Sequence, residues 1–303
     1  MVTISITHSA ENDHRNSQVK INVNGELSHR EEASVSVFDS GFLLGDGIWE
    51  GLRLHQKRWL FFDDHMDRLY AALKSVEIDF SLTREDVFAE LEKTRLANSM
   101  ESDVYARLMI TRGKKSKAFQ HPSFSIFGPT FVIIMEHSKP VLGSSKEGVK
   151  LVTVPQMRGQ PMVQDAKFNS HSKLNCVIAC LQSTKAGGDE ALMLDPHGFV
   201  STTNSCNFFV VRKGEVWTST GDYCMNGITR EKIIIACKSL GVPIFEKNFS
   251  LLESYSADEA FLTGTFGGVV QVSSIDGHKI GNGGEGKILV KLKKFYEAMI
   301  EKH

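Results

Sequence analysis

The polar run of residues 169–175, Asn-Ser-His-Ser-Lys-Leu-Asn, leads directly into an apolar helical pattern. A lysine at such a junction, here Lys173, can be desolvated, have its pKa lowered and form a Schiff base with a carbonyl compound. Taken alone, the segment is more simply read as a surface lysine on the first turn of a helix. The sequence therefore marks Lys173 as a candidate that needs support from other residues.

Two glycine-containing turns could hold an anion. Residues 227–230, Gly-Ile-Thr-Arg, stand just before a helical pattern, where free backbone N–H groups and the helix dipole favour phosphate. Residues 263–268, Thr-Gly-Thr-Phe-Gly-Gly, form a second small-residue loop after a strand. Taken alone, the first turn is more simply explained by an N-cap at Thr229, and the second is more simply an ordinary turn. His55 and His171 are isolated and are read as structural hydrogen-bond donors. No Walker loop or His-Glu-x-x-His motif occurs.

The elements that must position these residues follow from hydrophobic periodicity. Hairpin turns are expected at Asn24-Gly25 and at Gln56-Lys57, and two strand-like runs surround a Gly-rich loop in residues 34–54. Further strands are expected in residues 103–113, 129–137, 149–156, 191–195, 198–203 and 207–219. Helices are expected in residues 65–76, from a capping box at Thr83, in residues 173–186, from Thr229 and at the end of the chain. Strands cluster before helices in each half, which favours an α+β fold.

Several of the predicted helices carry explicit burial predictions. The helix of residues 173–186 is expected to bury Leu174, Val177, Ile178 and Leu181. The last helix is expected to bury a stripe made of Ile288, Leu289, Leu292, Phe295 and Met299.

Composition narrows the class of protein. The formal net charge of -1 gives no reason to expect nucleic acid or an anionic membrane as a partner. No apolar run reaches the about 18 residues of a membrane span, and the N-terminus lacks a signal-peptide pattern, so a cytoplasmic location is the default expectation. Five cysteines without a Cys-x-x-Cys pair argue against a disulfide framework or a metal site. We expect a tail in residues 1–18, a small domain in 19–136, a linker in 137–148 and a large domain in 149–303.

Five segments in order resemble the class IV (fold type IV) aminotransferases that depend on pyridoxal 5'-phosphate (PLP), the superfamily of branched-chain and D-amino-acid aminotransferases. They are VNGELSHREEASVSVFDSGFLLGDGIWEGLRL, FFDDHMDRLYAALKSVEI, DEALMLDPHGFVSTTNSCNFFVVRKGEVWT, NGITREKII and SADEAFLTGTFGGVVQVSSIDG. The resemblance covers roughly residues 20–300. It implies a two-domain α+β fold with PLP between the domains, and at least a homodimer.

The resemblance also implies roles for particular residues. Arg68 matches the arginine that binds the PLP phosphate, and its guanidinium fork suits a dianion. Ile228 and Thr229 would offer backbone N–H groups to the same phosphate, and Thr265 would complete the site. Trp49 and Arg53 match positions that line the substrate pocket. Lys117 lies near a loop that carries a carboxylate-binding arginine in D-amino-acid enzymes, although the local motif is not reproduced.

Two positions depart from the family pattern. The family has a glutamate at the pyridine nitrogen, five residues before the asparagine matched to Asn207, and this chain has Thr202 there. A hydroxyl cannot keep the ring protonated as a carboxylate does, so Thr202 predicts a weaker electron sink. The family's Schiff-base lysine falls on or beside Asn169. Lys173, one helical turn later, is favoured over Lys167 as its replacement.

The predicted function is therefore transamination between an amino acid, either a D-amino acid or a branched-chain L-amino acid, and a 2-oxo acid. The Gly47–Arg53 segment favours branched-chain enzymes, whereas Thr111-Arg112-Gly113 favours D-amino-acid enzymes. Two alternatives stay open. One is an aminodeoxychorismate lyase on the same fold. The other is a non-catalytic protein that keeps the fold, which the substitutions at Asn169 and Thr202 support.

Overall fold

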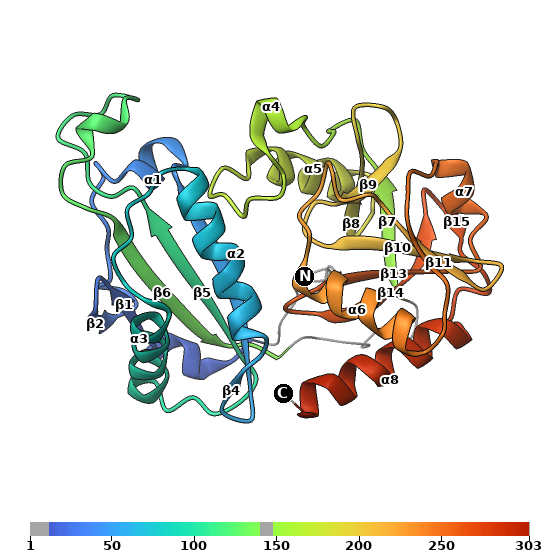
Figure 1. Cartoon of the computed structure of the whole chain (residues 1–303), viewed down its shortest axis with the longest axis horizontal. Coiled ribbons are helices and arrows are strands. Elements are labelled where there is room, and N and C mark those ends of the chain that lie inside the picture. The colour runs from blue at the N-terminus through green and yellow to red at the C-terminus, as the bar shows by residue number, and fades with distance from the viewer. Residues whose placement is uncertain (1–11, 140–147, 303) are drawn as a thin grey trace. The chain divides into compact units, whose positions relative to one another are not determined.

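The computed structural model of the chain describes residues 12–139 and 148–302 (Figure 1). The predicted tail and linker lie largely outside the described residues. The chain divides into two compact units, which we call the N-terminal unit, residues 12–139 with Phe168–Lys173, and the C-terminal unit, residues 148–167 and 174–302. Six residues of the predicted large domain thus pack with the N-terminal unit.

The N-terminal unit is built on a six-stranded sheet with the strand order β2-β1-β6-β5-β3-β4. Its elements are η1 (His14–Gln18), β1 (Lys20–Val23), β2 (Glu26–His29), α1 (Ser40–Leu44), β3 (Gly47–His55), β4 (Arg58–Trp59), α2 (Phe62–Ser75), α3 (Arg84–Ala97), β5 (Val104–Thr111), η2 (Pro122–Phe124) and β6 (Thr130–His137).

Local signals in the sequence set several of these boundaries. Both predicted hairpins are confirmed, and Asn24 and Gly25 take the positive φ values of 52° and 87° that the first turn requires. The Thr83 hydroxyl accepts from the backbone of Asp86, and the Asp86 carboxylate accepts from the backbone of Thr83, so the predicted capping box opens α3.

The prediction of two strand-like runs in residues 34–54 is wrong for the first run. Val35 and Val37 are exposed and join no strand, and the chain instead forms the short helix α1. The Asp39 carboxylate caps this helix by accepting from the backbone N–H of Gly41 at 2.8 Å. Gly45, at φ 68°, ends it. The glycines therefore close a helix where the alternating apolar residues had indicated a strand.

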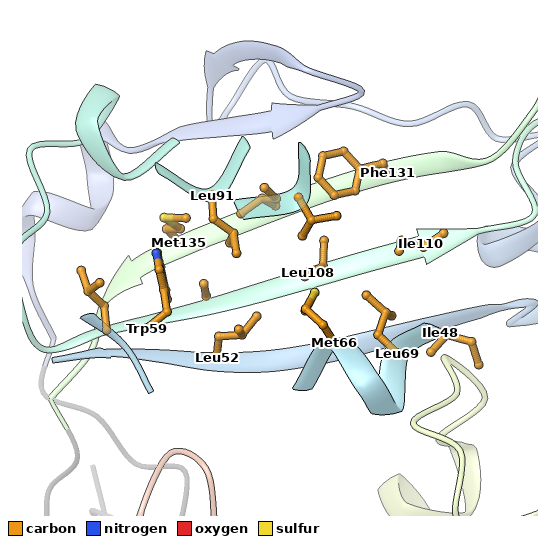
Figure 2. Packing of buried hydrophobic residues seen from close by; sticks show 14 of the residues in the cluster. Ile48, Leu52, Trp59, Met66, Leu69, Leu91, Leu108, Ile110, Phe131 and Met135 are labelled. Carbon is orange, nitrogen blue, oxygen red and sulfur yellow. The ribbon is translucent and has the colours of Figure 1, made fainter. Parts of the chain in front are cut away.

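One face of the N-terminal sheet carries the core of this unit. The helices α2 and α3 lie against it, and alternate residues of β3, β5 and β6 point into the interface (Figure 2). Figure 2 shows Leu52, Leu108 and Phe131 from the sheet facing Met66 and Leu91 from the two helices. The residues between these on the strands point to the opposite face and are mostly half-buried.

The C-terminal unit is built on a nine-stranded sheet with the order β12-β11-β10-β13-β14-β7-β8-β9, and β15 pairs with β14. Its elements are β7 (Val149–Thr153), α4 (Pro161–Gln164), α5 (Leu174–Lys185), β8 (Glu190–Leu194), β9 (Val200–Thr203), β10 (Asn207–Arg212), β11 (Glu215–Thr218), α6 (Ile228–Ser239), β12 (Ile244–Glu246), α7 (Leu251–Tyr255), β13 (Glu259–Gly264), β14 (Gly268–Ile275), β15 (His278–Lys279) and α8 (Lys287–Lys302).

The helix predicted in residues 173–186 is confirmed as α5, but its predicted burial is wrong. Leu174, Val177 and Leu181 are exposed to 71%, 52% and 55%, and the helix instead buries Ala179 and Ser183 against the sheet. Small residues allow the helix to approach the sheet closely, so α5 packs through its narrow side and leaves its larger apolar side chains outward.

The last helix matches its prediction in part. In α8, Leu289 and Leu292 are buried as expected, whereas Tyr296 and Ile300 replace Phe295 and Met299 on the buried side. The overall α+β class is confirmed in both units. Of the helices within the described residues, none has the length and apolar character needed to cross a bilayer.

Candidate active site

Residues 168–173 extend the N-terminal sheet at the free edge of β3. The backbone N–H of Trp49 donates to the Asn169 carbonyl, and that of His171 donates to the Gly47 carbonyl, both at 2.9 Å. Ile48 and Ser170 form the antiparallel bridge between these two bonds. The segment that carries Lys173 is therefore fixed to β3 by backbone pairing.

This pairing assigns side chains to faces of the sheet. Residues opposite each other in an antiparallel pair point to the same face, so Asn169 lies on the face of Trp49 and His171 on the face of Gly47. That face is the one opposite the core. Asn169, which occupies the expected position of the Schiff-base lysine, is buried to 3% exposure.

A cation–aromatic cluster forms around Trp49 on this face. The Arg107 guanidinium carbon lies 4.1 Å from the centroid of the Trp49 ring, and Lys173 Nζ lies 6.0 Å from it. Arg53 and Tyr105 are register partners on β3 and β5 and share the face. Arg53 Nε is buried and has no hydrogen-bond partner among the described residues. A guanidinium beside an aromatic ring, here Arg107 beside Trp49, forms a suitable surface for a carboxylate with an apolar substituent.

Gly51 explains how Tyr105 reaches this cluster. A Cβ atom at residue 51 would overlap the Tyr105 hydroxyl, so the tyrosine lies directly over the glycine. A larger residue there would push Tyr105 away from Arg53 and Arg107. The glycine thus shapes the face on which the predicted substrate-binding residues lie.

Arg68 approaches β3 from the α2 side and is held by a buried carboxylate. Its Nε and Nη2 donate to Glu50 at 2.8 and 2.7 Å, and His65 Nδ1 lies 2.7 Å from the same carboxylate. Burial alone raises the pKa of Glu50, but Arg68 and His65 outweigh it, so the net pKa is below the ordinary value. Arg68 stays charged, and its side chain is 17% exposed. The buried Glu50 carboxylate, which also contacts His65, holds its orientation.

The other predicted residues of the N-terminal unit have different surroundings. Lys117 is exposed in the loop after β5, and its Nζ lies 5.8 Å from the Phe124 ring. Arg112 donates to both Asp46 oxygens and to the carbonyls of Val76 and Glu77. Arg112 is therefore engaged in joining loops.

In the C-terminal unit, Thr202 is bonded to the backbone carbonyl of Cys206, the residue that precedes Asn207. Thr202 Oγ1 donates to the Cys206 carbonyl at 2.7 Å, and the residue is 3% exposed. Because its proton is used in this bond, the hydroxyl oxygen can only accept a hydrogen bond from a further group. Asn207 follows as the first residue of β10 and is also buried.

The N-terminus of α6 forms a turn that Asn207 closes. Asn207 Nδ2 donates to the Met225 carbonyl at 2.8 Å, and a Cβ at residue 227 would overlap Asn207 Oδ1. Gly227 is the N-cap and has no side chain to cap the first turn, so the N–H groups of Ile228 and Thr229 lie at an uncapped helix end. This end suits an anion.

The loop after β13 lies next to this turn. Thr263 is the register partner of Asn207, and its buried hydroxyl has no hydrogen-bond partner among the described residues. Thr265 follows at the end of the strand and is half-buried. An unpaired buried hydroxyl beside an uncapped helix end is the observation expected of a phosphate site, and it supports the predicted roles of Ile228, Thr229 and Thr265.

Lys167 differs from Lys173 in its position. It is exposed in the C-terminal unit, and its backbone N–H donates to the Asp165 carboxylate at 2.9 Å. Within the N-terminal unit, the structure brings together Trp49 and Lys173 and places Arg53 farther along the same face of β3. Thr202, Ile228, Thr229 and Thr265 all lie in the C-terminal unit.

Sequence reasoning missed Tyr105 and Arg107. The signal was present in the alternation of the strand Val104–Thr111, where Tyr105, Arg107 and Met109 are two residues apart. Their pairing with β3 could not be read from the sequence, so their proximity to Trp49 and Arg53 was not apparent.

Comparison with known proteins adds to this geometry. The family described as "Amino-transferase class IV" matches residues 47–275. The chain is 36% identical over 280 residues to a putative branched-chain-amino-acid aminotransferase of Methanocaldococcus jannaschii, a match that covers 92% of this chain and 96% of the relative. It is also 36% identical to the branched-chain-amino-acid aminotransferase-like protein 2 of Arabidopsis thaliana, and it spans about half (50%) of the length of that relative.

A solved structure is also similar. The branched-chain aminotransferase of the thermophilic archaeon Thermoproteus uzoniensis, determined with norvaline, superposes with a TM-score of 0.84 at 28% identity. The match covers 94% of this chain and 96% of that one. The fold type IV architecture predicted from the sequence is thereby confirmed.

Proposed function

Because the chain belongs to the class IV aminotransferase family, we propose that it is a PLP-dependent transaminase that moves an amino group between an amino acid and a 2-oxo acid. The observation that carries this proposal is the position of Lys173. Backbone pairing with β3 holds its segment beside Trp49 and Arg107, on a face suited to an amino acid's carboxylate and side chain.

Each unit, taken by itself, carries residues whose chemistry suits the phosphate of PLP. Arg68 would contribute a charged guanidinium, and the N-terminus of α6 would contribute the N–H groups of Ile228 and Thr229. Thr265, together with the unpaired hydroxyl of Thr263, would complete the set. When bound, PLP supplies the electron-accepting ring that makes amino-group transfer possible. Because its proton is donated to the Cys206 carbonyl, Thr202 Oγ1 would accept a hydrogen bond from the pyridine nitrogen only while that nitrogen carries a proton.

Lys173 is assigned as the reacting lysine, ahead of Lys167. Its amine would hold the cofactor covalently, then take the proton from the substrate Cα and return it as a general acid. Lys167 is exposed, whereas Lys173 is half-buried and its Nζ lies 6.0 Å from the centroid of the Trp49 ring. Arg107 would orient the carboxylate so that the Cα proton faces the lysine.

The substrate class stays as broad as the sequence predicts. A D-alanine aminotransferase of Listeria monocytogenes is 29% identical to this chain over 286 residues, and it stands beside the branched-chain relatives. The use of Arg112 in joining loops removes one argument for a D-amino-acid enzyme, since that side chain is not available to a carboxylate. We therefore propose a branched-chain or D-amino acid as the donor.

We also propose a homodimer. Apolar side chains that are exposed in the N-terminal unit gather in residues 35–44 and 119–127: Val35, Val37, Phe38, Phe42, Leu44, Phe119, Ile126 and Phe127. The backbone N–H groups of Ser40 and Lys115 donate to the carbonyls of Gly113 and Phe38, which ties the first segment to residues 113–115, and that of Ser116 donates to Phe124 in the second segment. Exposed apolar side chains on loops joined in this way are typical of a protein interface.

The test is an assay of the PLP-loaded chain with L-leucine or D-alanine as donor and 2-oxoglutarate or pyruvate as acceptor. We expect donor-dependent formation of the new amino acid, and a loss of rate of about 10²–10⁴-fold in Lys173→Ala. Lys167→Ala is the matched control and should keep its activity. Loss in the control instead would move the assignment to Lys167, and inactivity with every pair would contradict transamination.

A non-catalytic protein is the second candidate, because two substitutions favour it. Asn169 is buried at the family's lysine position, and the proton of Thr202 is already donated to the Cys206 carbonyl. This candidate predicts that PLP or a phosphate ligand binds without any donor-dependent reaction. The same assay, run with a measurement of PLP binding, separates the two.

A further inference from the structure

His171 carries a buried nitrogen that the mechanism above does not use. Its Nε2 is shielded from solvent and has no hydrogen-bond partner among the described residues. Its other interactions are well defined, since the backbone N–H donates to Gly47 and the ring packs on that glycine. A buried polar atom without a partner costs free energy, so it is expected where a ligand supplies the missing group.

The form of the imidazole decides which group it would take. Burial lowers the pKa of His171, and a hydrogen bond with the backbone of Ile48 opposes this effect only in part. The ring is therefore neutral near pH 7. A neutral imidazole has one N–H and one lone pair, and the bond to Ile48 uses the N–H. Nε2 is then an acceptor that requires a donor.

The surroundings of His171 supply the rest of the site. Asp39, Asp46 and Arg107 are the charged groups that act on its ring. Gly47 is two residues from Trp49 on β3, which places His171 about 7 Å along the strand from the ring over which Arg107 lies. An acceptor and a guanidinium are thus spaced to hold two groups of one small ligand.

We propose that His171 Nε2 accepts a hydrogen bond from the amino group of the amino-acid substrate, while Arg107 takes its carboxylate. His171 is in this sense a specificity-determining residue, because it distinguishes an amino acid from the same acid without its amino group. The inference rests on the proposed function in its choice of substrate, and it assigns a role to a side chain outside the lysine and phosphate sites.

The experiment compares two ligands that differ only in the amino group. Racemic α-methylleucine has no Cα hydrogen and cannot be transaminated, and 2,4-dimethylpentanoate is its counterpart without the amino group. Isothermal titration of the chain loaded with pyridoxamine 5'-phosphate, which has no aldehyde to condense with an amino group, measures both. In His171→Phe, we expect binding of α-methylleucine to weaken roughly tenfold or more. Binding of 2,4-dimethylpentanoate should stay within about twofold.

Two further variants serve as controls for His171→Phe. His171→Gln keeps an acceptor oxygen and should recover part of the α-methylleucine affinity. His55→Phe replaces the half-buried histidine at the far end of β3 and should change neither ligand. The pair of 2-aminoisobutyrate and isobutyrate repeats the comparison for a small substrate.

The outcomes separate the two claims. Equal weakening of both ligands in His171→Phe, or no weakening of either, overturns the role of His171 while leaving transamination in place. Failure of the wild-type chain to bind any of the four ligands overturns both the inference and the proposed amino-acid site.

Discussion

Glu50 is a fully buried carboxylate that holds Arg68 and His65. Replacing it by glutamine leaves the Arg68 guanidinium without its counter-charge, so we expect Glu50→Gln to lower the free energy of unfolding by about 3 kcal/mol at pH 7. Chemical denaturation measures the change. Glu31→Gln, an exposed carboxylate on the same unit, is the matched control and should stay within about 0.5 kcal/mol.

The same pair predicts a pH dependence. The pKa of Glu50 is lowered in the folded protein, so its contribution is fully present above the pKa of the unfolded chain, about 4.3, and is lost as the pH falls through the lower folded value. The difference in unfolding free energy between wild type and Glu50→Gln should therefore shrink steadily below about pH 4. A difference that is the same at pH 7 and pH 3 would show that the charge of Glu50 does not stabilise the fold.

Candidate residues could be marked from the sequence where a local pattern is sufficient. Ile228, Thr229 and Thr265 could be marked from glycine turns, because an uncapped helix end is a local property. Glu50 and His171 could not, since their partners come from other strands and helices. The sequence shows a side chain's type, and only the pairing of strands shows what lies opposite it.

At the scale of elements, the junction of β3 with residues 168–173 depends on Gly47. A Cβ there would lie 2.8 Å from the Ile110 carbonyl oxygen and 3.0 Å from His171 Cε1. We expect Gly47→Ala to push the segment away from β3 and to cost roughly 1–3 kcal/mol. It should also reduce the reaction of Lys173 with PLP, measured by absorbance.

Gly159→Ala is the matched control for this change. The nearest atom to a Cβ at residue 159 is 3.8 Å away, so the substitution should be nearly neutral. If Gly47→Ala binds PLP and unfolds as the wild type does, the junction does not position Lys173.

The helix α5 shows why element existence is easier to predict than its orientation. Its period of apolar residues correctly predicted a helix, yet Leu174, Val177 and Leu181 point outward. The spacing of apolar residues shows that a helix has two different faces. Which face packs on the sheet depends on how closely the helix can approach the sheet. Here Ala179 and Ser183 allow the closer approach.

At the scale of the whole molecule, five short segments in order were enough to predict the fold, because each fixes a strand–turn or strand–helix unit of known sequence. The strand order of each sheet was not predictable, since it depends on pairings between residues far apart in the chain.

We expect the exposed apolar side chains of residues 35–44 and 119–127 to form the dimer interface. Replacing Phe42 and Phe127 by aspartate places charges at side chains that are 70% and 59% exposed, so the fold should tolerate them. We expect the double variant to sediment as a monomer where the wild type sediments as a dimer. Leu252→Asp, on the equally exposed surface of α7, should leave the dimer intact. A wild-type monomer, or an unchanged dimer in the double variant, contradicts this interface.

The most direct test of the central claim is covalent attachment of PLP. The purified chain is mixed with PLP, its visible absorption spectrum is recorded, borohydride is added, and the labelled peptide is mapped by mass spectrometry. We expect a new absorption band that borohydride removes, with the label on Lys173. A label on Lys167 would contradict the assignment of the reacting lysine, and the absence of both band and label would contradict the claim that this chain is a PLP-dependent transaminase.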